Sequence, residues 1–276
     1  MKLALTQMNI FWEAPDKNRI TCRRLTELAS RHQCDWIVFP EMTLTGFTMQ
    51  PELIKPELFE TSVSSTGASA PILGHAFFQQ LSDEFHIGIV YGSIAYAASG
   101  QTPTYYNCME FLQNGVSTFD YCKIHPFTYG EEARHYTGGS RVKTTLDAKD
   151  KVCLSGFICY DLRFPEIFQI ASKDASVIFL IANWPEARIA HWYALLQARA
   201  IENQCFLIGV NRTGDGNGLS YSPSSVAYDP YGNRLTPACG DELLFAEIDP
   251  ALAAIYRAEF PVKADRKFII ENPSLL

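Results

Sequence analysis

Apolar and polar residues follow two distinct rhythms along the chain, one typical of strands and the other of helices. Short runs that are apolar throughout, such as VIFLIA at 177–182, predict strands buried on both faces. The segment 187–203 instead repeats its apolar residues at helical spacing, which predicts an amphipathic helix. Read in this way, the chain predicts strands at 2–10, 35–42, 87–96, 151–160, 176–184 and 205–211, helices at 17–32, 71–86, 165–172 and 187–203, and hairpins at 105–124 and 224–235.

These elements predict a layered α/β fold with a mixed sheet system, because strands that are apolar on both sides must be covered on both faces. No stretch rich in Pro, Gly or Ser divides the 276 residues, so we expect a single domain over 1–276. The C-terminal stretch 259–276 has no clear periodicity, and we expect it to pack at a subunit interface.

Composition narrows the classes of function. Hydrophobic residues make up 47% of the chain, whereas a formal net charge of −7 provides no basic stripe for nucleic acid. A small acidic substrate is compatible with this charge, because one local Arg or Lys binds a carboxylate. The run at 177–182 is far shorter than the ~20 residues of a membrane helix, and residues 1–13 do not form a signal peptide. We therefore expect a cytoplasmic protein with neither a membrane nor a nucleic-acid partner.

Cysteine usage bears on metals and redox chemistry. The chain has eight cysteines and no C-x-x-C pair, at positions 22, 34, 108, 122, 153, 159, 205 and 239. Several lie inside apolar runs, which indicates reduced, mostly buried thiols rather than a disulfide framework or a zinc site. The sequence also has no Gly-rich phosphate loop and no cluster with metal-ligand spacing, so we expect neither a metal nor a cofactor.

Glu41, Lys123 and Cys159 each follow an apolar run and precede a turn, so all three are expected at strand ends. Taken singly, each also fits a structural role. Together they fit nucleophilic catalysis, because a carboxylate can accept the proton of a thiol whose free pKa is ~8.5, while an ammonium group and a helix N-terminus favour the thiolate. The lysine and the N–H of Tyr160 would stabilise a tetrahedral oxyanion. The set suits acyl transfer from an amide or nitrile carbon.

The three residues lie in motifs that resemble those of the nitrilase superfamily of carbon–nitrogen hydrolases, namely FPEM (39–42), KIHPF (123–127) and GFICYDLRFPE (156–166). The order of the motifs also matches, and the likeness spans almost the whole chain. The resemblance implies an α-β-β-α sandwich that typically forms dimers. It also implies that Glu41 is the general base, Lys123 the transition-state stabiliser and Cys159 the nucleophile.

The same family uses a second glutamate shortly after its lysine motif. Glu131 and Glu132 stand there in tandem, and the distance to the following Tyr136 favours Glu132. His125 suggests the alternative of a Cys–His pair. However, positions two apart on a strand share a face, so a histidine two residues after Lys123 also fits a role in orienting the loop.

Two segments, EMTLTGFTM (41–49) and CYDLRFPE (159–166), most resemble the ω-amidase branch of the superfamily. That branch releases ammonia from short dicarboxylic monoamides such as 2-oxoglutaramate and 2-oxosuccinamate, so a cation is expected for the distal carboxylate. The cationic candidates are Arg134, Arg163, Arg188 and Arg212. The aromatic candidates for the substrate pocket, for which core packing is an equal alternative, are Phe47, Phe127, Tyr160 and Trp184.

Two other functions remain open from the sequence. One is hydrolysis of another small amide, a nitrile or an N-carbamoyl compound by the same residues. The other is a catalytically silent binding protein on the same fold, although the presence of all three catalytic residue types argues against it.

Overall fold

The computed structural model describes residues 1–63, 69–97, 103–238 and 240–267, and these residues form two β-sheets packed face to face. In the larger sheet the strand order is β15–β1–β2–β5–β4–β3, and β6 and β7 extend it from β5. Its strands are β1 (Lys2–Thr6), β2 (Trp36–Val38), β3 (Phe59–Val63), β4 (Ser69–Leu73), β5 (Gly88–Ala97), β6 (Thr104–Gln113), β7 (Val116–Cys122) and β15 (Leu243–Glu247).

The smaller sheet has the order β14–β11–β10–β9–β8, with β9, β10 and β11 parallel. Its strands are β8 (Thr145–Leu146), β9 (Cys153–Ile158), β10 (Val177–Ala182), β11 (Phe206–Asn211) and β14 (Val226–Tyr228). A separate hairpin follows β11 and consists of β12 (Gly214–Gly216) and β13 (Leu219–Tyr221).

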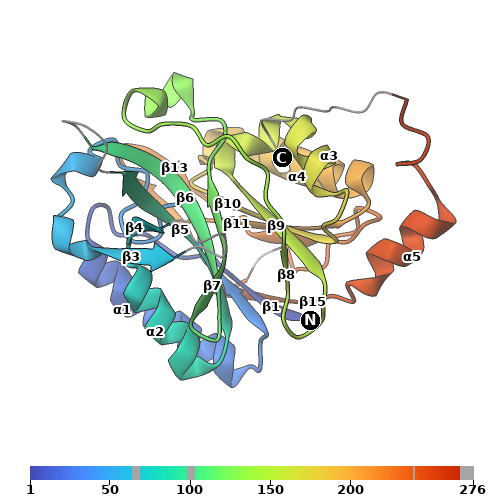
Figure 1. The fold of residues 1–276 in the computed structure, drawn as a ribbon, viewed down its shortest axis with the longest axis horizontal. Coiled ribbons are helices and arrows are strands. Elements are labelled where there is room, and N and C mark those ends of the chain that lie inside the picture. The colour runs from blue at the N-terminus through green and yellow to red at the C-terminus, as the bar shows by residue number, and fades with distance from the viewer. Residues whose placement is uncertain (64–68, 98–102, 239, 268–276) are drawn as a thin grey trace.

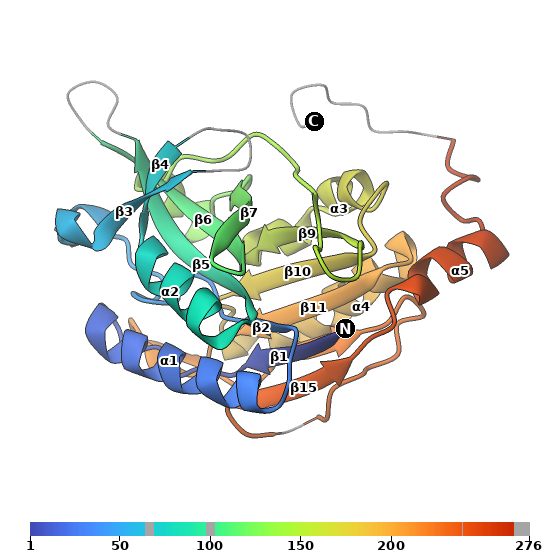
Figure 2. The ribbon, with the colours of Figure 1, turned by 60° about the horizontal axis from the view of Figure 1, so that its bottom comes forward.

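Helices cover the outer face of each sheet (Figures 1 and 2). Helices α1 (Pro15–Arg31) and α2 (His75–Phe85) lie on the larger sheet, whereas α3 (Pro165–Ala171) and α4 (Ile189–Asn203) lie on the smaller one. The fifth helix, α5 (Ala251–Glu259), follows β15. The molecule is therefore an α-β-β-α sandwich, and the predicted fold class is confirmed.

Two cores hold these four layers together. Between the sheets, aromatic rings such as Phe111 and Phe179 pack edge to face at 5.4 Å. Under α1 and α2, Phe78 stacks on Tyr91 of β5 at 4.0 Å. Strands β2 and β10 are buried at every position, and both are apolar throughout, as burial on both faces requires.

Most predicted elements occur close to their predicted bounds. The predicted turn at Asn114-Gly115 joins β6 to β7, with both residues in the left-handed region at φ 51° and 69°, as a two-residue hairpin loop requires.

The helix predicted over 71–86 was wrong at its start. Leu73 ends strand β4, and Gly74 then turns the chain at a φ of 74°, so that helix α2 begins only at His75. The sequence pattern also missed β3, β12, β13, β15 and α5.

The C-terminal prediction is only partly within the described residues, since 268–276 lie outside them. The described part contacts its own chain: Arg266 donates to the Glu202 carbonyl at 2.8 Å, and Gln204 donates to the Phe260 carbonyl at 2.7 Å. Packing of this stretch against a second subunit stays a prediction. No helix within the described ranges is long and apolar enough to cross a membrane.

Candidate active site

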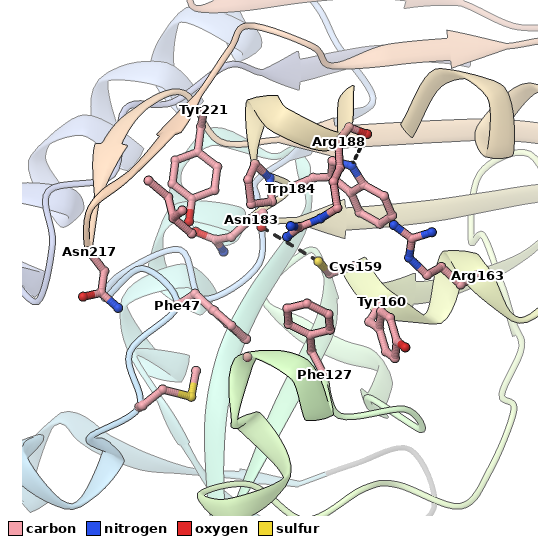
Figure 3. Close-up of a pocket in the computed structure, with 14 residues that line it drawn as sticks. Phe47, Phe127, Cys159, Tyr160, Arg163, Asn183, Trp184, Arg188, Asn217 and Tyr221 are labelled. Atoms are coloured by element: carbon pink, nitrogen blue, oxygen red, sulfur yellow. Dashed lines mark hydrogen bonds between the residues drawn. The ribbon is translucent and has the colours of Figure 1, made fainter. Parts of the chain in front are cut away.

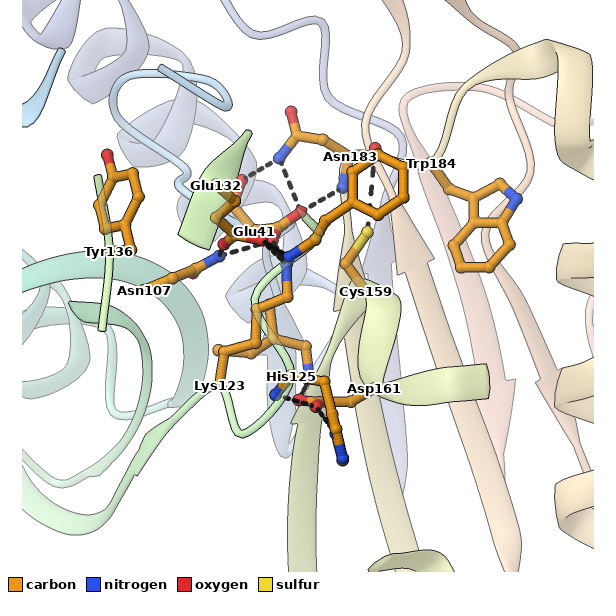
Figure 4. A network of polar contacts seen from close by, with 12 residues as sticks. Glu41, Asn107, Lys123, His125, Glu132, Tyr136, Cys159, Asp161, Asn183 and Trp184 are labelled. Carbon is orange, nitrogen blue, oxygen red and sulfur yellow. Dashed lines mark hydrogen bonds and ion pairs between the residues drawn. The ribbon is translucent and has the colours of Figure 1, made fainter. Parts of the chain in front are cut away.

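Glu41, Lys123 and Cys159 follow β2, β7 and β9, and the fold brings these three strand ends together (Figure 4). The Nζ atom of Lys123 lies 3.0 Å from Oε1 of Glu41 and 2.8 Å from Oε2 of Glu132. Glu132 begins a short 3-10 helix, Glu132–Arg134, just after another one at Thr128–Gly130.

Asn107 completes what we call the Lys123 cluster, which consists of Glu41, Asn107, Lys123 and Glu132. Its side-chain nitrogen lies 2.7 Å from Oε1 of Glu41 and 2.8 Å from Oε1 of Glu132, so one amide donates to both carboxylates. Asn183 supports Glu41 from the other sheet, because its backbone N–H donates to Oε2 at 2.8 Å.

All four side chains of the Lys123 cluster are buried. Burial disfavours the charge on Lys123, but the carboxylates of Glu132 and Glu41 outweigh it and raise the pKa of the ammonium group. Burial also raises the pKa of Glu132, with Lys123 opposing and Glu41 adding to the rise. Two carboxylates thus share one cation, and this arrangement favours uptake of a proton by Glu132.

Cys159 occupies a sharp bend between β9 and the 3-10 helix Cys159–Arg163. Its φ of 46° lies in the left-handed region, which is costly for a residue with a side chain and recurs at functional sites. Asp161 holds the bend, since its carboxylate accepts hydrogen bonds from the Ile158 N–H at 3.2 Å and the Tyr121 hydroxyl at 2.8 Å.

The surroundings of Cys159 favour the protonated form of its thiol. Burial, and then the charge of Glu41, raise the pKa of the thiol well above its ordinary value, although Lys123 acts in the opposite direction. The sequence analysis predicted that Glu41 accepts the thiol proton while Lys123 and a helix N-terminus favour the thiolate. Lys123 does lower the pKa of the thiol, but burial and Glu41 outweigh it, and Glu41 is the ionisable group that interacts with this thiol most strongly.

A small pocket of about 150 Å³ opens on Cys159 (Figure 3). All four aromatic candidates line it, together with two of the four arginine candidates: Phe47, Phe127, Tyr160, Trp184, Arg163 and Arg188. The backbone N–H of Tyr160 is the second of the 3-10 helix Cys159–Arg163, so it belongs to the helix-start donors that have no acceptor within the helix.

Comparison with known proteins agrees with this geometry. The family model described as carbon-nitrogen hydrolase matches residues 2–258. The 2-oxoglutaramate amidase of Bacillus subtilis is 32% identical over 95% of this chain and 96% of its own length, and the omega-amidase YafV of Escherichia coli K12 is 30% identical over 96% of both chains. A CN-hydrolase superfamily protein of Xanthomonas campestris, XC1258, superposes with a TM-score of 0.81 at 26% identity and covers 99% of both chains.

The chain belongs to the carbon–nitrogen hydrolase family. It is therefore a hydrolase of carbon–nitrogen bonds other than peptide bonds, and the resemblance inferred from the three motifs is confirmed.

The four arginine candidates of this carbon–nitrogen hydrolase separate clearly. Arg163 and Arg188 line the pocket, each with its guanidinium over an aromatic ring, at 5.0 Å from Trp184 and 5.6 Å from Phe127 respectively. Arg134 lies on the surface and pairs with Glu131 at 2.6 Å. Arg212 is buried and donates to the backbone carbonyls of Ile10 and Asp215, both at 2.9 Å.

The remaining candidates also differ in position. Glu132 lies in the Lys123 cluster of the hydrolase, whereas Glu131 is exposed. His125 contacts Asp161 at 2.8 Å and stacks on Phe164 at 3.8 Å, which fits the loop-orienting role. Among the described residues, no group of three or more His, Cys, Asp or Glu side chains is arranged to hold a metal ion.

Asn107 and Asn183 are site residues that the sequence analysis did not single out. The sequence held one sign of Asn107, because it is a polar residue among the apolar residues of the predicted hairpin. The structure shows that its side chain is buried. Asn183 lies in the ANWP segment (182–185). Its contact with Glu41 could not be read from the sequence, because the side-chain amide donates to the Glu41 backbone carbonyl across the fold.

Proposed function

We propose that this carbon–nitrogen hydrolase is an ω-amidase, which releases ammonia from the terminal amide of a short dicarboxylic monoamide of the 2-oxoglutaramate or 2-oxosuccinamate type. One observation carries the proposal: a small pocket holds the thiol of Cys159 beside the Lys123 cluster and also two guanidinium groups. The names of the relatives in Bacillus subtilis and Escherichia coli support the same class of substrate.

The first half of the reaction forms a thioester. Glu41 takes the proton of the Cys159 thiol as Sγ attacks the amide carbon. The oxyanion that develops is stabilised by the ammonium group of Lys123 and the N–H of Tyr160. Glu41 then returns the proton to the amide nitrogen, the carbon–nitrogen bond breaks and ammonia leaves.

The second half consumes water. Glu41 or Glu132 accepts a proton from a water molecule, whose oxygen attacks the thioester carbon. The carbon–sulfur bond breaks and the sulfur is protonated, which regenerates the thiol. The former amide carbon is now a carboxylate, and the dicarboxylate product leaves the site. One water is consumed for each ammonia, so the enzyme returns to its starting state.

Arg163 and Arg188 are the proposed ligands of the carboxylate distal to the scissile amide. A guanidinium group can bind a carboxylate in bidentate fashion, and the aromatic rings beneath both groups limit their orientations. Because the pocket is only about 150 Å³, it favours a short acyl chain. Phe47, Phe127 and Trp184 supply its apolar walls.

A substrate panel read by ammonia release tests this proposal. Four-carbon and five-carbon ω-monoamides, with and without a 2-oxo group, are compared with nitriles, N-carbamoyl amino acids and a neutral amide of equal length. We expect the ω-monoamides to have the highest kcat/KM. Preference for a nitrile or an N-carbamoyl compound would assign another activity of the family, and no turnover of any compound would favour the silent binding protein.

Two further properties belong to this proposal. We propose that the enzyme is a homodimer, as the family resemblance implies, and that it acts in the cytoplasm, as the sequence predicts. Sedimentation of the purified protein tests the dimer, and cell fractionation tests the location.

A further inference from the structure

Cys108 and Cys122 lie directly opposite each other on β6 and β7, next to the Lys123 cluster. Their sulfur atoms are 2.7 Å apart, whereas a disulfide requires about 2.05 Å. Their immediate neighbours along the chain are Asn107 and Lys123, and Lys123 N–H donates to the Asn107 carbonyl at 2.8 Å.

This last bond makes Asn107 and Lys123 the hydrogen-bonded pair of the ladder. Cys108 and Cys122 therefore form the adjacent non-hydrogen-bonded pair, in which opposite side chains approach most closely. The two thiols also differ in access to solvent. Cys122 is partly exposed, whereas Cys108 is only 4% exposed and its pKa is raised by burial and by the neighbouring thiol.

We propose that Cys108 and Cys122 form a modification site, at which a peroxide converts the opposed thiols into an intrachain disulfide. The sulfur of Cys122, the accessible member, attacks one oxygen of the peroxide; the O–O bond breaks, water is released and a sulfenic acid forms. The sulfur of Cys108 then attacks the sulfenic sulfur, and a second water leaves as the disulfide closes. Two thiols lose two electrons and two protons, and one peroxide is reduced.

Closure of this disulfide changes the geometry beside the Lys123 cluster. Formation of the bond brings the two sulfur atoms from 2.7 Å to about 2.05 Å, so groups at this pair must shift. We expect the shift to reach the adjacent residues Asn107 and Lys123 of the Lys123 cluster. Displacement of catalytic groups by a fraction of an ångström lowers turnover. This effect on turnover rests on the proposed function, whereas formation of the bond does not.

Formation of the bond is tested in Cys159→Ala, which lacks the proposed nucleophile. The protein is treated with hydrogen peroxide, alkylated with iodoacetamide and mapped by mass spectrometry without reduction. We expect a peptide cross-linked between positions 108 and 122, reversed by a dithiol reductant and absent when Cys122→Ser is added. If Cys153, which is also partly exposed, is oxidised while Cys108 and Cys122 stay uncrosslinked, the proposed site is wrong.

The effect on the active site is tested with the Cys159 enzyme. Turnover is divided by the fraction of Cys159 that iodoacetamide still alkylates, so direct oxidation of the nucleophile is removed from the comparison. We expect oxidation to lower this ratio several-fold in the wild type and to leave it unchanged in Cys122→Ser, with recovery by the reductant. An unchanged ratio in the cross-linked wild type would overturn the coupling to the Lys123 cluster.

Discussion

Strand β6 contributes a side chain to each of two buried polar clusters, and only one of these clusters lies beside Cys159. The Lys123 cluster receives Asn107 from one face of β6. What we call the Glu110 cluster (His75, Tyr91 and Glu110) uses the opposite face, because residues 107 and 110 differ by an odd number of positions on the strand.

The two clusters differ in what their charges contact. In the Glu110 cluster, the carboxylate accepts from the Tyr91 hydroxyl and lies 2.9 Å from Nδ1 of His75, beneath helix α2. The charges that act on the Cys159 thiol come instead from Glu41, Lys123 and Glu132. In the Lys123 cluster, two carboxylates share one ammonium group beside Cys159, the proposed nucleophile. Buried charge alone is therefore a weak sign of catalysis, and access to a reacting atom is the stronger one.

The first prediction, which has the largest expected effect, compares one Glu→Gln substitution in each cluster. Glu41→Gln removes the general base and should lower kcat by roughly 10²–10⁴-fold with little loss of structure. Glu110→Gln should leave kcat unchanged but destabilise the fold by about 1–3 kcal/mol, because a buried hydrogen-bond network is disturbed. Ammonia release and thermal unfolding of both variants check this contrast. Equal losses of kcat in the two would break the distinction.

The second prediction concerns Asn107 as a positioning residue. Asn107→Leu removes two N–H donors that favour the ionised carboxylates, so the pair should take up a proton at higher pH. The acid limb of the kcat/KM profile should move to higher pH, and kcat/KM at neutral pH should fall roughly 10-fold to 100-fold.

A matched control for this variant is Asn18→Leu. Asn18 is equally buried but bonds to the backbone of Phe11 and Leu44, so its replacement should lower stability without moving the acid limb. An acid limb that stays in place in Asn107→Leu would reduce Asn107 to a structural role.

The third prediction concerns the protonation of Cys159. Because the charge of Glu41 raises the pKa of this thiol, Glu41→Gln should lower that pKa. The pH dependence of thiolate absorbance, measured as the difference from Cys159→Ala, follows this shift. A thiol pKa that rises in Glu41→Gln would contradict the assignment of Glu41 as the carboxylate facing Cys159.

The fourth prediction has the smallest effect and tests selectivity in the pocket. Arg188→Met should raise KM for ω-monoamides roughly 10-fold while leaving KM for a neutral amide unchanged, because only the former carries a distal carboxylate. The exposed Arg134→Met serves as control and should change neither value. Equal effects on both substrates would mean that Arg188 shapes the pocket rather than binding a carboxylate.

Much of the fold and the identity of the central side chains could be predicted from the sequence. Continuous apolar runs marked β9 and β10, because burial on both faces leaves a strong signal. The start of α2 was mispredicted because Leu73 continues the helical spacing of that helix. Only Gly74, at positive φ, separates strand β4 from α2. Short strands such as β3 and β12 leave too few positions to show a period.

The residues proposed for the site could be named from the sequence, but their contacts could not. Arg134, Arg188 and Arg212 all lie near motifs, and the sequence gives no reason to choose among them. The fold separates them. Arg134 forms an ion pair with Glu131, and Arg212 donates to the carbonyl of Asp215 in the hairpin of β12 and β13. Of the three, Arg188 alone lines the pocket. The protonation of Cys159 also required coordinates, because it depends on burial and on the approach of Glu41.

Ammonia release by purified Cys159→Ala tests the central claim most directly. The variant is confirmed as folded by circular dichroism and is assayed with the preferred amide at the wild-type protein concentration. The mechanism predicts no release above the uncatalysed rate, because the thioester cannot form. Sustained release of ammonia by the folded variant would contradict covalent catalysis through Cys159.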